Sequence, residues 1–104
     1  MDSKTCFIMN KAEIVVCEYF GVAPDDILDK GHKTEQSLAR GMLWYILHND
    51  YSIATSVIAN TYFRHRRGVF AQLAKTKSAI KLNRRYKIYY KEIREILDKE
   101  LPLD

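Results

Sequence analysis

The chain has 104 residues, of which 47% are hydrophobic and 29% charged, and this size and composition indicate one small globular domain. No apolar run approaches the roughly 20 residues of a membrane-spanning helix, and the N-terminus lacks a basic segment followed by an apolar one, so the sequence predicts a cytoplasmic protein with no membrane partner. The formal net charge of +4 is too small to indicate a partner by itself.

The first elements along the chain are predicted to be helical. Apolar residues recur at helical spacing over residues 11–20, and Gly21 directly after them is the residue type that commonly ends helices in the left-handed conformation. A turn then leads into a short helical segment, whose Ile27 and Leu28 are expected to enter the core. A longer helix is predicted from Thr34, as its N-cap, to about His48, and its apolar stripe makes it the candidate for the most buried element.

The second half of the chain is predicted to contain three more helices. Ser52 is expected to cap a short helix of about ten residues. After a basic turn, apolar residues at helical spacing predict a helix over residues 69–80, and a last helix is expected from about Arg84 to Leu101, where Pro102 ends it. No segment alternates apolar and polar residues as a strand would, so the predicted fold class is all-α with about five to six helices.

Basic residues are concentrated in one stretch of the chain. There is no Asp or Glu from Tyr51 to Lys91, and the stretch holds ten basic residues: Arg64, Arg66, Arg67, Lys75, Lys77, Lys81, Arg84, Arg85, Lys87 and Lys91. Such a block attracts polyanions, because each phosphate that is neutralised releases condensed counterions. A solvated basic face without a partner is the alternative interpretation, and the charge pattern alone leaves it open.

The residues from Ser52 to Ile80 have the form of two helices joined by a tight turn, with a second helix that opens with basic residues. This is the arrangement that places a recognition helix in the major groove of DNA. The candidate base and groove contacts are Arg64, His65, Arg66 and Arg67. Lys75 and Lys77, further along the helix, are expected to meet phosphates. The spacing is weakly specific, because helix pairs with short turns are common in helical proteins.

Several segments, in a fixed order, carry a resemblance to a known family. A first helix ends in Tyr-Phe-Gly-Val at residues 19–22, and the acidic Asp-Asp-Ile-Leu follows at residues 25–28. The long helix contains Leu-Ala-Arg-Gly-Met-Leu-Trp-Tyr at residues 38–45, and a serine-led segment follows at residues 52–62. In these segments the chain resembles the C-terminal DNA-binding domain of the bacterial chromosomal replication initiator DnaA, over about residues 10–91.

The resemblance implies an all-α, Trp-repressor-like helix-turn-helix architecture. It also implies binding of double-stranded DNA in replication initiation or its regulation, in a bacterial chromosome, a phage or a mobile element, with replication or phage proteins as further partners. It divides the chain into an N-terminal extension (residues 1–10), the DNA-binding domain (11–91), and the end of the last helix with a tail (92–104). Its further phosphate contacts would be Lys33, Arg40 and Ser52.

The chain departs from the family at the motif that reads bases. The family has Gly-Gly-Arg-Asp-His-Ser/Thr-Thr-Val, whereas residues 63–69 are Phe-Arg-His-Arg-Arg-Gly-Val, without the glycine pair, the Asp or the hydroxyl residues. A carboxylate can accept a hydrogen bond from cytosine, whereas Arg prefers guanine or phosphate. The sequence therefore predicts an altered, more phosphate-driven recognition and not binding to the usual DnaA box.

No pattern of residues points to an enzyme. The chain has no Gly-rich phosphate loop ending in Gly-Lys-Ser/Thr, and its histidines and cysteines lack zinc-ligand spacing, so no catalysis, cofactor, metal or small-molecule substrate is predicted. Two alternatives to duplex binding stay open. One is an adaptor that uses the DnaA-like fold to hold another protein. The other is an RNA or single-strand binder that uses the tyrosine-rich basic residues 84–91, although tyrosines at helical spacing favour core positions.

Overall fold

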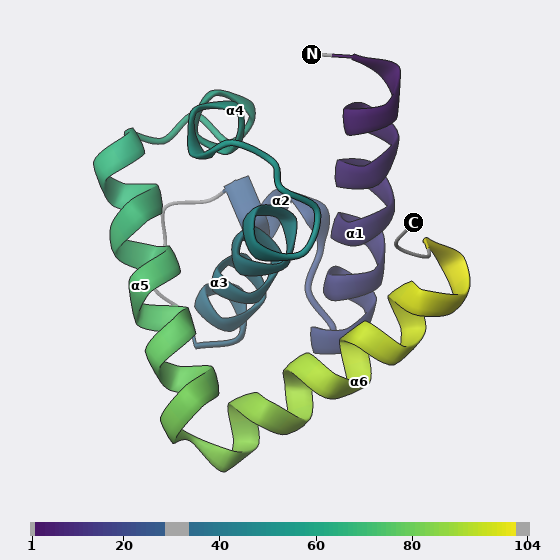
Figure 1. The fold of residues 1–104 in the computed structure, drawn as a ribbon, viewed down its shortest axis with the longest axis vertical. Helices are drawn as coiled ribbons and strands as arrows, with labels where there is room; N and C mark the ends of the chain where they lie inside the picture. The colour runs from purple at the N-terminus through teal and green to yellow at the C-terminus, as the bar shows by residue number, and fades with distance from the viewer. Residues whose placement is uncertain (1, 29–33, 102–104) are drawn as a thin grey trace.

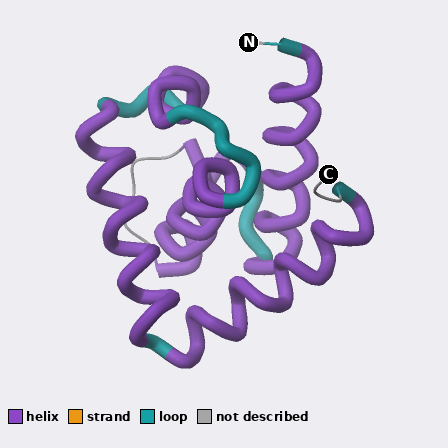
Figure 2. The backbone as a smooth tube through the Cα atoms, viewed as in Figure 1, coloured by secondary structure: helices purple, strands orange, loops and turns teal. Residues whose placement is uncertain are grey.

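The computed structural model describes residues 2–28 and 34–101, and these residues form six α-helices and no strand (Figures 1 and 2). The predicted all-α fold with five to six helices is therefore confirmed. The helices are α1 (Ser3–Phe20), α2 (Pro24–Leu28), α3 (Thr34–Asn49), α4 (Thr55–Thr61), α5 (Arg66–Leu82) and α6 (Arg84–Glu100).

Helix α3 is the central element, with α1 packed on one side and α5 on the other (Figure 1). More than half of its 16 residues are buried, as its apolar stripe predicts. Gly41 allows the closest approach to α5, because a Cβ atom there would lie 2.5 Å from Gln72 Nε2 and 2.6 Å from Thr76 Oγ1. The backbone of α3 and the inner side of α5 are thus in direct contact, and this contact fixes which side of α5 faces outward.

The two ends of α1 differ in how well the sequence predicts them. Gly21 ends the helix with a left-handed φ of 69°, as expected. The helix begins at Ser3, however, instead of at Lys11, and Asp2 caps it by accepting a hydrogen bond from the Thr5 backbone N–H at 2.7 Å. Residues 6–9 are all apolar, so they show no helical periodicity, and the pattern could not reveal the first turns.

The last residues of α2 attach it to the domain, but only one of Ile27 and Leu28 is buried. Ile27 is fully buried, whereas Leu28 is 42% exposed, so the expectation that both enter the core is wrong for Leu28. Arg40 from α3 reaches the end of α2 and donates from Nε to the Ile27 carbonyl oxygen at 3.1 Å and from Nη2 to the Asp26 carbonyl oxygen at 3.4 Å. These bonds satisfy carbonyl groups that a helix end leaves without helical partners.

The predicted capping of α4 by Ser52 is wrong. The helix begins at Thr55, and the N-cap residue is Ala54, which makes no side-chain cap. Ser52 has a left-handed φ of 57° and belongs to the turn that follows α3. This turn is closed by the Ile53 backbone N–H, which donates to the Leu47 carbonyl oxygen at 3.0 Å, and it places Ile53 in the core.

A polar cluster at the end of α3 fastens α6 to the rest of the domain. The Asp50 carboxylate accepts hydrogen bonds from the Tyr90 hydroxyl at 2.9 and 3.0 Å and from Arg94 Nη1 at 3.3 Å. The Asp50 side chain is 7% exposed and that of Arg94 is 12% exposed, so the pair lies largely out of water. Nearby, the Tyr51 hydroxyl donates to the Leu101 carbonyl oxygen at 2.9 Å.

Replacement of Asp50 by Ala should lower the free energy of unfolding by about 3 kcal/mol, because it leaves the buried Arg94 guanidinium without its inner carboxylate. Asp98 also pairs with Arg94 but is 61% exposed, so Asp98→Ala should cost less than about 1 kcal/mol. Urea unfolding followed by circular dichroism measures both. Equal losses in the two variants would show that α6 is not held at Asp50.

The tyrosines predict a loss of stability in alkali. Burial raises the pKa of Tyr19, Tyr45, Tyr62 and Tyr90 above the ordinary value of 10.0, and for Tyr19 the pKa rises to about 12, with the hydrogen bond to Glu92 adding to the effect of burial. The unfolded chain ionises these groups near pH 10, whereas the folded protein keeps them neutral to higher pH. Their contribution to stability is therefore complete below pH 10 and is lost as the pH rises through the folded-state values.

The check is urea unfolding at a series of pH values, together with tyrosinate absorbance of the folded protein. Stability should fall from about pH 10 upward, while most tyrosinate absorbance should appear only as the helices are lost. Full ionisation near pH 10 without loss of helix would contradict the burial of these hydroxyls.

Candidate nucleic-acid interface

Helices α4 and α5 are joined by residues 62–65 and run in clearly different directions (Figure 1). The turn is closed by the Arg64 backbone N–H, which donates to the Ala59 carbonyl oxygen at 2.8 Å. His65 is the N-cap residue of α5 in an extended conformation, and its carbonyl oxygen accepts from the Val69 N–H at 3.1 Å. The first turn of α5 contains no acidic residue.

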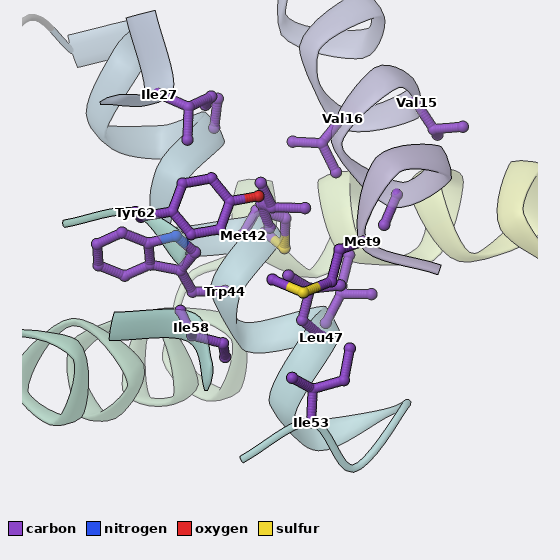
Figure 3. Packing of buried hydrophobic residues seen from close by; sticks show 14 of the residues in the cluster. Met9, Val15, Val16, Ile27, Met42, Trp44, Leu47, Ile53, Ile58 and Tyr62 are labelled. Carbon is purple, nitrogen blue, oxygen red and sulfur yellow. The ribbon is translucent and has the colours of Figure 1, made fainter. Parts of the chain in front are cut away.

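Tyr62 anchors this turn to the body of the domain. Its side chain points inward and is 3% exposed, and its ring lies 5.9 Å from that of Trp44 on α3 (Figure 3). The Tyr62 hydroxyl donates to Glu13 Oε1 on α1 at 3.0 Å. Burial, followed by the negative charge of Glu13, raises the pKa of this hydroxyl. The turn before α5 is therefore connected to both α1 and α3.

Arg64 lies partly inside the protein. Its guanidinium carbon is 5.8 Å from the centre of the Trp44 ring, and its Nη2 donates to the Leu28 carbonyl oxygen at 3.4 Å. The residue therefore packs the turn against α2 and α3 in this structure. Its role as a base contact stays a prediction, and in that role its guanidinium would have to leave these positions.

The other three candidate base contacts are exposed at the start of α5. His65, Arg66 and Arg67 all face solvent, as does Gly68 after them. A shallow depression of about 890 Å³ lies between the end of α4 and the start of α5, and it is lined by residues 64–68 together with Ala59, Asn60 and Ala71. The four candidate base contacts thus all line one shallow depression.

The outward side of α5 has small residues at its centre and basic residues at its edges. The buried residues of the helix are Val69, Leu73 and Thr76. With about 3.6 residues per turn, the opposite side carries exposed small residues at Ala71, Ala74 and Ser78. Two large apolar residues are also exposed there, Phe70 at the edge and Leu82 at the end of the helix. The exposed basic residues beside this small-residue centre are Arg67 at its start, Lys75 along one edge, and Lys77 and Lys81 along the other. Lys75 and Lys77 therefore share a helix surface with the candidate base contacts.

Two of the remaining predicted phosphate contacts, Arg40 and Ser52, are not part of this surface. Arg40 is 6% exposed and bonds to the carbonyl groups at the end of α2, so its guanidinium is engaged within the protein. Ser52 is exposed but lies in the turn between α3 and α4. Lys33 lies outside the described residues. Contact of these three residues with DNA stays a prediction.

Further exposed basic residues lie in the first half of α6, which the sequence-based choice of DNA contacts did not include. Asn83 caps α6 by accepting a hydrogen bond from the Arg85 backbone N–H at 2.9 Å. The exposed basic residues of this helix half are Arg84, Arg85, Lys87 and Lys91. A groove of about 600 Å³ runs beside Arg84 and Arg85, toward Thr34 at the start of α3. The absence of Asp and Glu from residue 51 to residue 91 was the sequence signal that could have added these residues to the predicted DNA contacts.

The tyrosines of α6 are largely committed to packing. The Tyr89 ring lies 5.3 Å from that of Phe20, and the Tyr90 ring lies 5.7 Å from that of Tyr45, both edge-on. Because these rings contact other aromatic side chains and are half-buried, they offer little free face for stacking on single-stranded bases.

Comparison with known proteins gives no further guide to this surface. No family model matches the chain, and no curated protein matches it. Among the described residues, no helix has the length and apolar character to cross a membrane. The function is therefore argued from the surface itself.

Stability measurements should separate Arg64 from its exposed neighbours. Arg64→Ala should lower the free energy of unfolding by about 1 kcal/mol, because it removes the cation–π contact with Trp44 and the hydrogen bond to Leu28. Arg67→Ala should change stability by less than about 0.5 kcal/mol, because the side chain is exposed. Urea unfolding of both variants tests this, and an equal effect would mean that Arg64 does not brace the turn.

Proposed function

We propose that this chain binds double-stranded DNA with α5 as the recognition helix, in replication initiation or its regulation. The observation that carries the proposal is the outward side of α5, where small side chains are bordered by exposed basic ones. An α-helix with its side chains is about 10–12 Å across and the major groove about 12 Å wide, so small residues at the centre allow the helix to approach the bases closely.

The charges along this surface fit a phosphate backbone. Lys75 lies on one edge of α5, and Lys77 and Lys81 lie on the other, so basic groups can reach the backbones on both sides of the groove. The first turn of α5 carries Arg66 and Arg67 where a helix end prefers acidic residues. A bound phosphate would neutralise the positive charge of the two arginines and of the helix N-terminus. This concentration of positive charge supports an anionic partner.

The specificity of the site is proposed to lie with the exposed arginines. Arg66 and Arg67 are exposed to solvent, whereas Arg64 packs on Trp44. Arginine pairs with the O6 and N7 atoms of guanine or with phosphate. This assignment agrees with the loss of the Asp of the DnaA motif, and it predicts a preference for guanine and not for the usual DnaA box.

Fluorescence anisotropy with a labelled duplex tests the proposal. The double variant Arg66→Ala/Arg67→Ala should weaken duplex binding at least about tenfold, because each arginine that contacts a base contributes about 1–3 kcal/mol. The matched control is Lys4→Ala/Lys99→Ala, which removes the same charge from exposed sites at the start of α1 and the end of α6, across the molecule from α5 (Figure 1). Equal affinities of the two variants would contradict the assignment of α5.

The salt dependence separates backbone contacts from base contacts. In Lys75→Ala/Lys77→Ala the slope of log affinity against log salt concentration should become shallower by about two, since each phosphate contact contributes roughly 0.9. Single-stranded DNA and RNA of matched length are the competing probes. Preference for either would favour the single-strand alternative, and no binding to any nucleic acid at low salt would favour the protein adaptor.

A further inference from the structure

Phe63 lies in the turn between α4 and α5, at a position where a phenyl side chain does not help the protein to fold. Its backbone has a left-handed φ of 55°, where glycine or asparagine is favoured and a bulky side chain is strained. Its side chain is 77% exposed, so the ring adds almost nothing to the core. A glycine at this position would satisfy the turn at lower cost, and the fold therefore gives no reason for a phenyl ring.

The neighbours of Phe63 hold its backbone at a defined place. Tyr62 points inward and bonds to Glu13 on α1, and Arg64 lies over Trp44 on α3. The turn is also closed by the Arg64 N–H bond to Ala59. Because the residues on both sides are fixed to the domain, little backbone entropy would be lost when the ring meets a partner.

The charges around Phe63 indicate which partner the ring meets. From residue 51 to residue 91 the chain has no Asp or Glu, and the exposed Arg66 and Arg67 follow Phe63 by three and four positions. An apolar protein surface would have to desolvate these arginines without compensation, whereas a nucleic acid neutralises them with its phosphates. A phenyl ring cannot hydrogen-bond to base edges, but it can stack on a base face where a base step opens.

We propose that Phe63 acts as a wedge that packs into the base stack of duplex DNA, at a step beside those contacted by α5. The inference rests on the proposed function and names its preferred substrate, which is duplex DNA that opens easily. Flexible pyrimidine–purine steps, and steps already opened by a mismatch, would bind best because less stacking has to be broken.

The test compares two labelled duplexes of one sequence, one fully paired and one with a single central mismatch. The wild-type chain should prefer the mismatched duplex by about tenfold, and Phe63→Gly should lose this preference. The melting temperature of Phe63→Gly should not fall, because glycine suits the left-handed turn and the lost ring is exposed. Ile96→Ala is the control, since it removes a 39% exposed apolar side chain on α6, outside the proposed contact surface, and should keep the preference.

The outcomes distinguish this inference from the function beneath it. Equal binding of both duplexes by the wild-type chain and by Phe63→Gly would overturn the wedge and leave duplex binding intact. Failure of the wild-type chain to bind either duplex at low salt would overturn both proposals. If Phe63→Gly instead abolished self-association of the free protein in light scattering, with duplex affinity unchanged, the ring would be a contact between two copies and the wedge would be refuted.

Discussion

The close packing of α5 on α3 at Gly41 determines how the rest of the surface is presented. Since Gly41 has no side chain, Gln72 and Thr76 can lie against the α3 backbone. The inner side of α5 is fixed by this contact and by the buried Val69 and Leu73. The orientation of the basic outer side follows, because a rigid helix cannot turn one side inward without turning the other side outward. A larger side chain at Gly41 would therefore shift α5 and change the orientation of its basic side, although no exposed residue is altered.

The domain separates the interactions that stabilise it from the charges that it displays. Its described ion pairs lie at one place, where Arg94 on α6 meets Asp50 and Asp98. Along α5, by contrast, the arginines of the first turn lie at the positive end of the helix, an arrangement that costs free energy in the isolated protein. The described ion pairs and the buried core around α3 thus stabilise the fold at residues other than the exposed arginines of α5.

Much of the fold follows from local patterns, and the exceptions have identifiable causes. Periodicity predicted the long helices except the first turns of α1, and Gly21 marked the end of α1 because its left-handed conformation is a local property. Ser52 was misassigned because a serine before a helical pattern suits both a cap and a turn, and only the packing of Ile53 decides between them. The burial of Arg40 depends on the end of α2, and the packing of Arg64 depends on Trp44 of α3, contacts that no local pattern reveals. The exposure of Arg66 and Arg67 does not depend on contacts with distant residues, so it could be expected from the sequence.

The hydrogen bond between Tyr62 and Glu13 has a consequence for how such a domain can evolve. It joins the turn before α5 to α1, and the two residues are 49 positions apart in the chain. A change of Glu13 to an apolar residue would leave the buried hydroxyl of Tyr62 without its acceptor, so the two positions should change together among homologues. A residue of the first helix is thereby constrained by the turn that leads into α5, although it contributes nothing to the basic surface itself.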